Sequence, residues 1–145
     1  HYETTPAMST IAVRNTIIAR VKKGCQVVVA NFANADMIGH TGNEAAARKA
    51  LTILDQSIKT IIEKTKKYAT IIITADHGKV ERMRDAKTDE VITEHTTNPV
   101  PFILVSEQYR GKRLQSHGRL ADIAPTVLAL LNINKQKEMT GKSLL

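Results

Sequence analysis

Three short stretches carry side chains that could bind a metal ion. NFANADMIGHTG, residues 31–42, places Asp36 and His40 four positions apart, and ITADHG ends in the pair Asp76 and His77. A further histidine, His95, lies in EHTTNP. Imidazole nitrogen and carboxylate oxygen suit divalent ions such as Mn²⁺ or Zn²⁺, and the absence of a cysteine cluster argues against a structural zinc site. These residue types favour a catalytic metal site.

Each of these groups also has an ordinary structural interpretation. Asp36 and His40 could be a loop cap and a surface histidine, and Asp76 could close a turn with Gly78 at positive φ. His95 could be solvated or bonded to a loop carbonyl. If the fold brings these loops to one place, all three structural explanations would have to be true at once to dismiss a metal site. This coincidence of position favours the metal site.

The surrounding sequence predicts a βαβ unit that would do so. Residues 25–32 form a short apolar, β-branched run, which is typical of a strand covered on both faces. Apolar residues then recur at helical spacing over residues 43–67, and a second apolar run covers residues 69–75. We expect the two strands to be parallel, with a right-handed crossover, so that the loops after them meet at one edge of the sheet.

The other predicted elements complete a three-layer α/β domain, a mostly parallel sheet with helices on both faces. A first helix should begin at the Thr4-Thr5-Pro6 cap and end at Gly24. A third strand is expected over residues 101–105, and a last helix over residues 120–131, interrupted near its start by Pro125. Residues 135–142 are polar and should be irregular. The stretch 31–42 is expected to be a loop.

Composition narrows the function classes. The 145 residues, 42% of them hydrophobic, are enough for one compact domain. Twenty-one basic and 14 acidic residues give a net charge of +7, which suits an anionic partner. The sole cysteine, Cys25, excludes an intramolecular disulfide, favours a reducing compartment such as the cytoplasm, and is expected to be a small buried hydrophobe. No apolar run is long enough for a membrane span, and no signal-peptide pattern is present.

The motifs resemble one known family. NFANADMIGHTG, ITADHG, EHTTNPVPFI and GRLADIAPTVLALL followed by EMTGKSLL are similar to the closing motifs of the cofactor-independent (2,3-bisphosphoglycerate-independent) phosphoglycerate mutases of the alkaline phosphatase superfamily. The opening YETTPAMS resembles the stretch by which that family's chain re-enters its metal-binding domain. The resemblance therefore covers the chain almost end to end and implies an alkaline-phosphatase-like fold.

The resemblance implies an isomerase that interconverts 3-phosphoglycerate and 2-phosphoglycerate through a phosphoserine intermediate, with two Mn²⁺ ions and no need for 2,3-bisphosphoglycerate. It assigns Asp36, His40 and His95 to one Mn²⁺ and Asp76 with His77 to the other. The ions would activate the serine and neutralise the transferred phosphoryl group. We expect a cytoplasmic enzyme that is a monomer at full length.

The resemblance also implies that residues 1–145 correspond to the C-terminal portion of the metal-binding domain. The chain begins with His1 in place of methionine, which fits a piece of a longer product. The family's nucleophilic serine, a remaining metal-binding aspartate and the inserted substrate-binding domain would then lie outside this chain. No serine here stands in a matching motif, so we expect no catalytic residue in this chain and no mutase activity from it alone, and substrate-binding residues stay unassigned.

Two departures from the family pattern occur beside the predicted ligands. Ala35 stands where family members usually have proline, which should leave the ligands in place. Lys79 replaces the common asparagine after ADHG and adds a charge. Lys79, Arg82 and Arg84 are candidates for pairing with substrate phosphate, although a run of charge is more often a solvated face.

Two other function classes stay open from the sequence. Another alkaline-phosphatase-superfamily phosphomutase, or a metal-dependent phosphatase, would share ADHG but not the HTTNPVPF-like string. A nucleic-acid-binding module would explain the positive charge. Against it, basic residues are spread over several predicted helices and only five aromatic residues are available for base stacking. We expect a small phosphorylated substrate as the partner, with no nucleic acid and no membrane.

Overall fold

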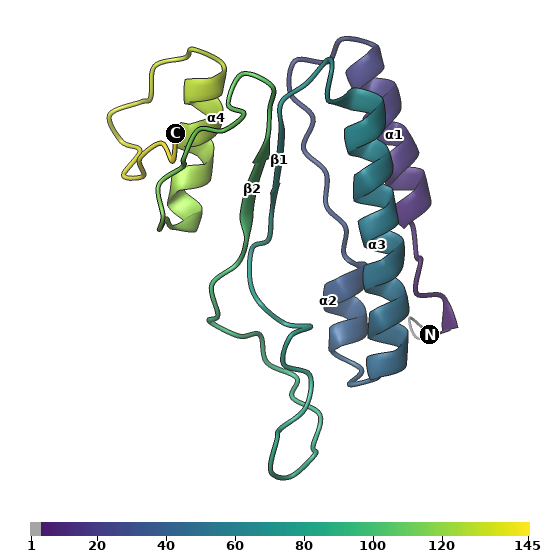
Figure 1. Cartoon of the computed structure of the whole chain (residues 1–145). Helices are drawn as coiled ribbons and strands as arrows, with labels where there is room; N and C mark the ends of the chain where they lie inside the picture. The colour runs from purple at the N-terminus through teal and green to yellow at the C-terminus, as the bar shows by residue number, and fades with distance from the viewer. Residues whose placement is uncertain (1–3) are drawn as a thin grey trace. The chain divides into compact units, whose positions relative to one another are not determined.

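A computed structural model describes residues 4–145, which form two compact units divided after Gln108. The first unit carries α1 (Thr10–Lys22), α2 (Asn34–Gly39), α3 (Glu44–Thr65), β1 (Ile71–Thr74) and β2 (Phe102–Val105) (Figure 1). The second unit carries a 3₁₀ turn (Leu120–Asp122) that runs directly into α4 (Ile123–Leu130). Among the described residues, no helix is long and apolar enough to cross a membrane.

The helices follow the predicted periodicity, with small shifts at their ends. The long predicted helix over residues 43–67 is confirmed as α3, and Asn43 caps it by accepting a hydrogen bond from the backbone N–H of Ala46. The first helix was expected to begin at Pro6 but begins at Thr10, because Met8 has a positive φ of 43° and interrupts the turn before it. It ends where predicted, before Gly24 at φ +80°.

The core of the first unit is small and lies where helices meet. α1 and α2 both pack against α3, as Figure 1 shows. The buried apolar cluster comprises Ile38, Ala46, Ala47, Ala50 and Met83. Ile38 is fully buried and belongs to α2, the short helix that also carries Asp36. The core therefore fixes the element on which the first predicted metal-binding pair stands.

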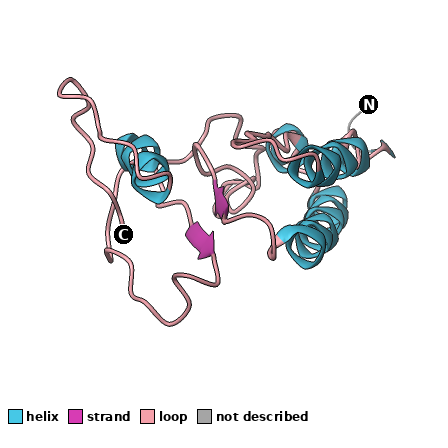
Figure 2. Cartoon of the chain, turned by 90° about the horizontal axis from the view of Figure 1, so that it is seen from above, coloured by secondary structure: helices cyan, strands magenta, loops and turns pink. Residues whose placement is uncertain are grey.

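The sheet differs from the prediction. β1 and β2 confirm the strands expected at 69–75 and 101–105, but they pair antiparallel, with Ile71 opposite Val105 and Thr74 opposite Phe102. The 27-residue connection between them contains no helix, and a parallel pair needs a crossover that carries the chain back along the sheet. In the described chain the sheet has only these two strands, the two short arrows of Figure 2, and no three-layer arrangement is present.

The strand predicted over residues 25–32 is not formed. This segment runs in an irregular extended conformation, and no backbone hydrogen bond joins residues 26–32 to another described residue. An apolar run becomes a strand only when neighbouring strands satisfy its N–H and C=O groups, and none does so here. Consequently Val29 is 92% exposed, and Cys25, expected to be buried, is exposed as well.

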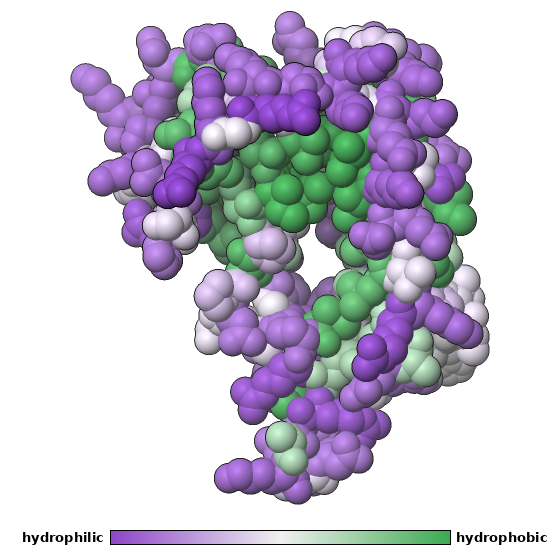
Figure 3. All heavy atoms as spheres, viewed as in Figure 1, coloured by the Kyte–Doolittle hydropathy of each residue, from purple (hydrophilic) through white to green (hydrophobic). Residues whose placement is uncertain are grey.

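Apolar side chains of the sheet are also only partly covered. No residue of β1 or β2 is buried, and Ile103 is 48% exposed. Figure 3 shows hydrophobic atoms open on the face where β1 and β2 lie in Figure 1. The first unit thus has a packed helical part and a sheet part whose apolar residues are left in contact with solvent.

The second unit is held by its C-terminal tail. Asp122 accepts hydrogen bonds from the backbone N–H groups of Arg119 and Lys142, at 2.7 and 2.8 Å. The buried Thr126 hydroxyl accepts from the N–H of Leu144 at 3.0 Å. Pro125 lies in the first turn of α4, where a missing N–H is tolerated, so the predicted interruption is only the short 3₁₀ turn. Residues 135–142 are irregular, as predicted.

Candidate metal site

Asp36 and His40 are positioned by a helix that the sequence did not predict. Residues 34–39 of the expected loop form α2, so Asp36 lies in its first turn and His40 is its C-cap. The i, i+4 spacing then brings both side chains to one face, with His40 Nε2 at 3.3 Å from Asp36 Oδ1. The four-residue spacing noted in the sequence was therefore a helical spacing.

His77 and His95 reach the same place from the connection between β1 and β2, residues 75–101. This connection is hairpin-like, and we call it the excursion. Thr96 donates its N–H to the carbonyl of Gly78 at 2.8 Å, and a second antiparallel bridge joins Arg84 to Val91. Pairing Gly78 with Thr96 places the preceding residues His77 and His95 side by side. Their rings stack, with centroids 3.7 Å apart and planes inclined by 13°.

Three donor atoms of the cluster form a nearly equilateral triangle. Asp36 Oδ1 lies 3.3 Å from His40 Nε2 and 3.3 Å from His95 Nε2, and the two imidazole nitrogens are 3.1 Å apart. Ligands about 2.1 Å from one ion are separated by about 3.0 Å at octahedral angles and by about 3.4 Å at tetrahedral angles. The measured edges lie between these values, so a single divalent ion fits all three atoms.

The state of two polar atoms also fits a cation. Asp36 Oδ1 and His77 Nδ1 are buried and have no hydrogen-bond partner among the described residues. A buried polar atom without a partner costs free energy. For Asp36, whose Oδ1 faces two imidazole nitrogens, a bound cation would supply the missing interaction.

The two remaining predicted ligands differ in their placement. His77 joins Asp36 and His95 in a second possible ligand group, whose donor atoms all lie within 4.8 Å of one another. Asp76 is 87% exposed, and its Oδ2 lies 3.6 Å from His77 Nε2. The structure therefore brings four of the five side chains into one cluster, with Asp76 at its edge.

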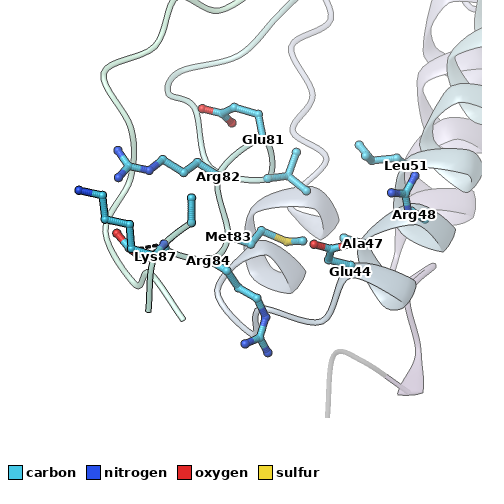
Figure 4. Close-up of a pocket in the computed structure, with 12 residues that line it drawn as sticks. Glu44, Ala47, Arg48, Leu51, Glu81, Arg82, Met83, Arg84 and Lys87 are labelled. Carbon is cyan, nitrogen blue, oxygen red and sulfur yellow. Dashed lines mark hydrogen bonds between the residues drawn. The ribbon is translucent and has the colours of Figure 1, made fainter. Parts of the chain in front are cut away.

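A cavity nearby contains none of the predicted ligands. It has a volume of about 790 Å³ and lies between the start of α3 and residues 80–87 (Figure 4). Arg82 and Arg84, two of the candidates for phosphate binding, line this cavity. In Figure 4, Arg82 and Lys87 extend away from α3, so the basic groups do not converge on one point. We place the candidate site at the Asp and His cluster for this reason.

Interactions within the chain already occupy Arg84. Its Nε donates to the carbonyl of Gly42 at 3.0 Å, and its Nη1 donates to the carbonyl of Asp89 at 2.7 Å. It also forms an ion pair with the Asp89 carboxylate at 3.4 Å. These contacts close the tip of the excursion against the loop after α2, so Arg84 has a structural role in this chain.

Sequence reasoning missed the network that holds the excursion together. The Glu81 carboxylate accepts hydrogen bonds from the backbone N–H of Lys79 at 2.7 Å, from the Asn98 amide at 3.0 Å and from the Thr96 hydroxyl. The hydrogen bond from Thr96 is the largest cause of a lowered pKa for Glu81. The sequence carried one indication, since polar residues follow His95 directly in EHTTNP and follow His77 after one glycine in DHGKVE.

Comparisons with known proteins agree with the chemistry of this cluster. The model of a family described as "Metalloenzyme: Metalloenzyme superfamily" matches residues 1–135. The chain is similar to 2,3-bisphosphoglycerate-independent phosphoglycerate mutases, with 45% identity to that of Ehrlichia canis, 43% to that of Clostridium tetani and 46% to that of Gloeothece citriformis. Each comparison covers 99% of this chain but only 28 to 29% of the relative. The chain thus spans less than a third of the curated relatives it matches.

Proposed function

Because the chain belongs to the Metalloenzyme superfamily, we propose that it is the metal-binding part of a cofactor-independent phosphoglycerate mutase. This enzyme would interconvert 3-phosphoglycerate and 2-phosphoglycerate through a phosphoserine. The single observation that carries the proposal is the triangle of Asp36 Oδ1, His40 Nε2 and His95 Nε2, with edges of 3.1 to 3.3 Å. Identity of 42% or more to phosphoglycerate mutases along 99% of the chain supports this reaction over other metal-dependent ones.

In this proposal Asp36, His40 and His95 hold one Mn²⁺, and Asp76 and His77 contribute to a second. Bound Mn²⁺ would lower the pKa of a coordinated hydroxyl and neutralise charge on the transferred phosphoryl group. The chain's own residues would fix the position of the metal ions. α2 sets the spacing of Asp36 and His40, and the bridge between Gly78 and Thr96 sets His77 beside His95. A set of three protein ligands leaves further coordination positions open for substrate oxygen.

The proposal places the phosphoryl-accepting serine and the substrate-binding domain in parts of the enzyme outside these 145 residues. The chain alone should then bind Mn²⁺ but not interconvert the phosphoglycerates. Without a nucleophile the bound ion could at most support slow hydrolysis of a poorly held substrate. Assembly of the whole enzyme as a cytoplasmic monomer is part of the same proposal.

Mn²⁺ titration of the chain tests the ligand assignment. The free ion can be followed by its paramagnetic resonance signal in the chain and in a His40→Ala variant. We expect the variant to bind at least about tenfold more weakly, because one of three ligands is lost. The matched control is His117→Ala, an exposed histidine of the second unit that lies outside the cluster. Equal affinities in the chain and the His40→Ala variant would contradict the assignment.

Product analysis tests the reaction. The full-length enzyme should convert 3-phosphoglycerate to 2-phosphoglycerate in the presence of Mn²⁺, and His40→Ala should abolish this conversion. The 145-residue chain under the same conditions should form no 2-phosphoglycerate. Formation of 2-phosphoglycerate by the chain would show that a nucleophile had been overlooked, and release of phosphate in place of the isomer by the full-length enzyme would indicate a phosphatase.

A further inference from the structure

One buried side chain contacts all three segments that carry the cluster. Lys79 is only 3% exposed, and its Nζ donates hydrogen bonds to the carbonyl oxygens of Ile92 at 2.6 Å and Glu94 at 3.2 Å. Glu94 directly precedes His95 in the chain. The ammonium group of Lys79 therefore anchors the segment that delivers His95 to the site.

The aliphatic part of Lys79 contacts the segment that carries the other two ligands of the triangle. A methyl group built on Gly39 would lie 2.9 Å from Lys79 Cγ, so the lysine stem occupies the space beside this glycine. Gly39 is the last residue of α2 and precedes His40. Lys79 itself follows His77 by two residues. It thus joins α2, the turn after β1 and the strand-like segment before Thr96.

The interactions of this lysine point to a role beyond general stability. No carboxylate lies within 4.0 Å of Nζ among the described residues, so the charge is compensated by the two carbonyl groups. Burying a charge without an ionic partner is costly, and a neutral side chain would avoid that cost. An apolar residue of similar length, such as methionine, could pack against Gly39, but it could not donate to either carbonyl.

We propose that Lys79 is a positioning residue for the metal site, and this inference rests on the proposed function. By holding the carbonyls of Ile92 and Glu94 against α2, it sets the 3.3 Å separation between His95 Nε2 and Asp36 Oδ1. Replacing a residue that orients a metal ligand without itself binding the metal commonly lowers metal affinity by about 10- to 100-fold. Lys79 acts through the backbone carbonyls of Ile92 and Glu94 and not through the His95 ring, which contacts the cluster.

The test compares Lys79→Met with Lys79→Arg in the 145-residue chain. Lys79→Met keeps most of the stem but removes the donors, and we expect Mn²⁺ to bind about tenfold or more weakly. Lys79→Arg keeps a charge and several donors and should restore part of the affinity. Lys67→Met is the matched control, because Lys67 is exposed and lies after α3.

A metal-free measurement separates this inference from the proposed function. The ring protons of His95 are shifted by the stacked His77 ring, so their NMR resonances report the position of His95 without any ion. We expect Lys79→Met to move these resonances and Lys67→Met to leave them unchanged. If the unmodified chain bound no Mn²⁺, the proposed function would fail, whereas the NMR shifts would still test the position of His95.

Unchanged His95 resonances together with unchanged Mn²⁺ affinity in Lys79→Met would overturn the inference. Circular dichroism checks that the helices are retained. If Lys79→Met loses its helical signal, Lys79→Gln, which keeps a polar end, replaces it in both measurements, and unchanged affinity and resonances in that variant would overturn the inference equally. Loss of the helices in both variants would also overturn it, because Lys79 would then support the whole fold.

Discussion

Two regions of the first unit differ in how their backbone N–H and C=O groups are paired: residues 25–32, which the sequence predicted as a strand, and the excursion between β1 and β2, for which it predicted no strand. In the excursion between β1 and β2, residues 78–84 pair with residues 91–96 through backbone bridges, and Lys79, Glu81 and Arg84 add side-chain hydrogen bonds. In residues 26–32, no backbone group is paired among the described residues, and Val29 is almost fully exposed.

This difference shows which features the chain can build by itself. The excursion pairs Gly78 with Thr96 and Arg84 with Val91 and needs no other strand, so His77 and His95 are brought together within this one segment. A strand covered on both faces needs neighbours on each side and a covering layer. The apolar run over residues 25–32 lacks both here, and it stays unpaired although its composition favours a strand.

The largest stability effect is expected at the core beneath the metal site. Ile38→Ala removes a fully buried side chain of α2 and should lower the free energy of unfolding by about 2 to 5 kcal/mol. Urea denaturation followed by circular dichroism measures it. A loss below about 1 kcal/mol would mean that α2 is not held by this core, and the contrast with residues 26–32 would weaken.

A smaller but more specific effect is expected at the shared ligand. Asp36→Asn keeps the size of the side chain but removes its negative charge, and Asp36 Oδ1 faces both His40 and His95. Mn²⁺ affinity should fall by more than about tenfold, which corresponds to about 1.4 kcal/mol. Calorimetric titration checks this. Retained affinity would indicate that the ion binds elsewhere than at the triangle.

Acidification should weaken the excursion by protonating Glu81. The pKa of Glu81 is lowered below its ordinary value of 4.5, mainly by the Thr96 hydroxyl, with the Asn98 amide and the N–H of Lys79 also contributing. The folded excursion therefore favours the carboxylate. The resulting stabilisation is present above about pH 4.5 and is lost as the pH falls through the lower pKa of the folded state.

Hydrogen exchange of the Thr96 amide, which donates to Gly78, measures that loss between pH 6 and pH 3. Protection, corrected for the intrinsic pH dependence of exchange, should decrease toward the acid end. Glu81→Gln should lower protection at pH 6 and flatten this dependence. If protection of the Thr96 amide depended on pH in Glu81→Gln as it does in the original chain, the loss of protection in acid would come from another titrating group.

The smallest effect is expected in the unpaired segment. Val29→Ser replaces an apolar side chain that is 92% exposed, so the free energy of unfolding should change by less than about 0.5 kcal/mol. The urea midpoint of the variant, measured beside that of Ile38→Ala, gives the comparison directly. A loss of more than 1 kcal/mol would show that residues 26–32 are packed in solution, against the contrast drawn above.

The sequence by itself determined the helix from Asn43 onward, the positions of both strands and the five candidate ligands. These depend on local information: the helical repeat of apolar residues, the Asn43 cap and polar residues at the ends of β-branched runs. The spacing of Asp36 and His40 is also local information, but the sequence did not predict the helix that carries it, because a six-residue helix has too few positions to show a periodic pattern.

Only the tertiary structure decided the direction of β2, the absence of a strand over residues 25–32 and the burial of Lys79. Strand direction depends on how the chain returns between Thr74 and Phe102, and strand formation depends on partners distant in sequence. A lysine among charged residues is normally solvated. Lys79 is buried because Gly39 makes room for its stem and the carbonyls of Ile92 and Glu94 receive its ammonium group, and neither condition can be read from neighbouring residues.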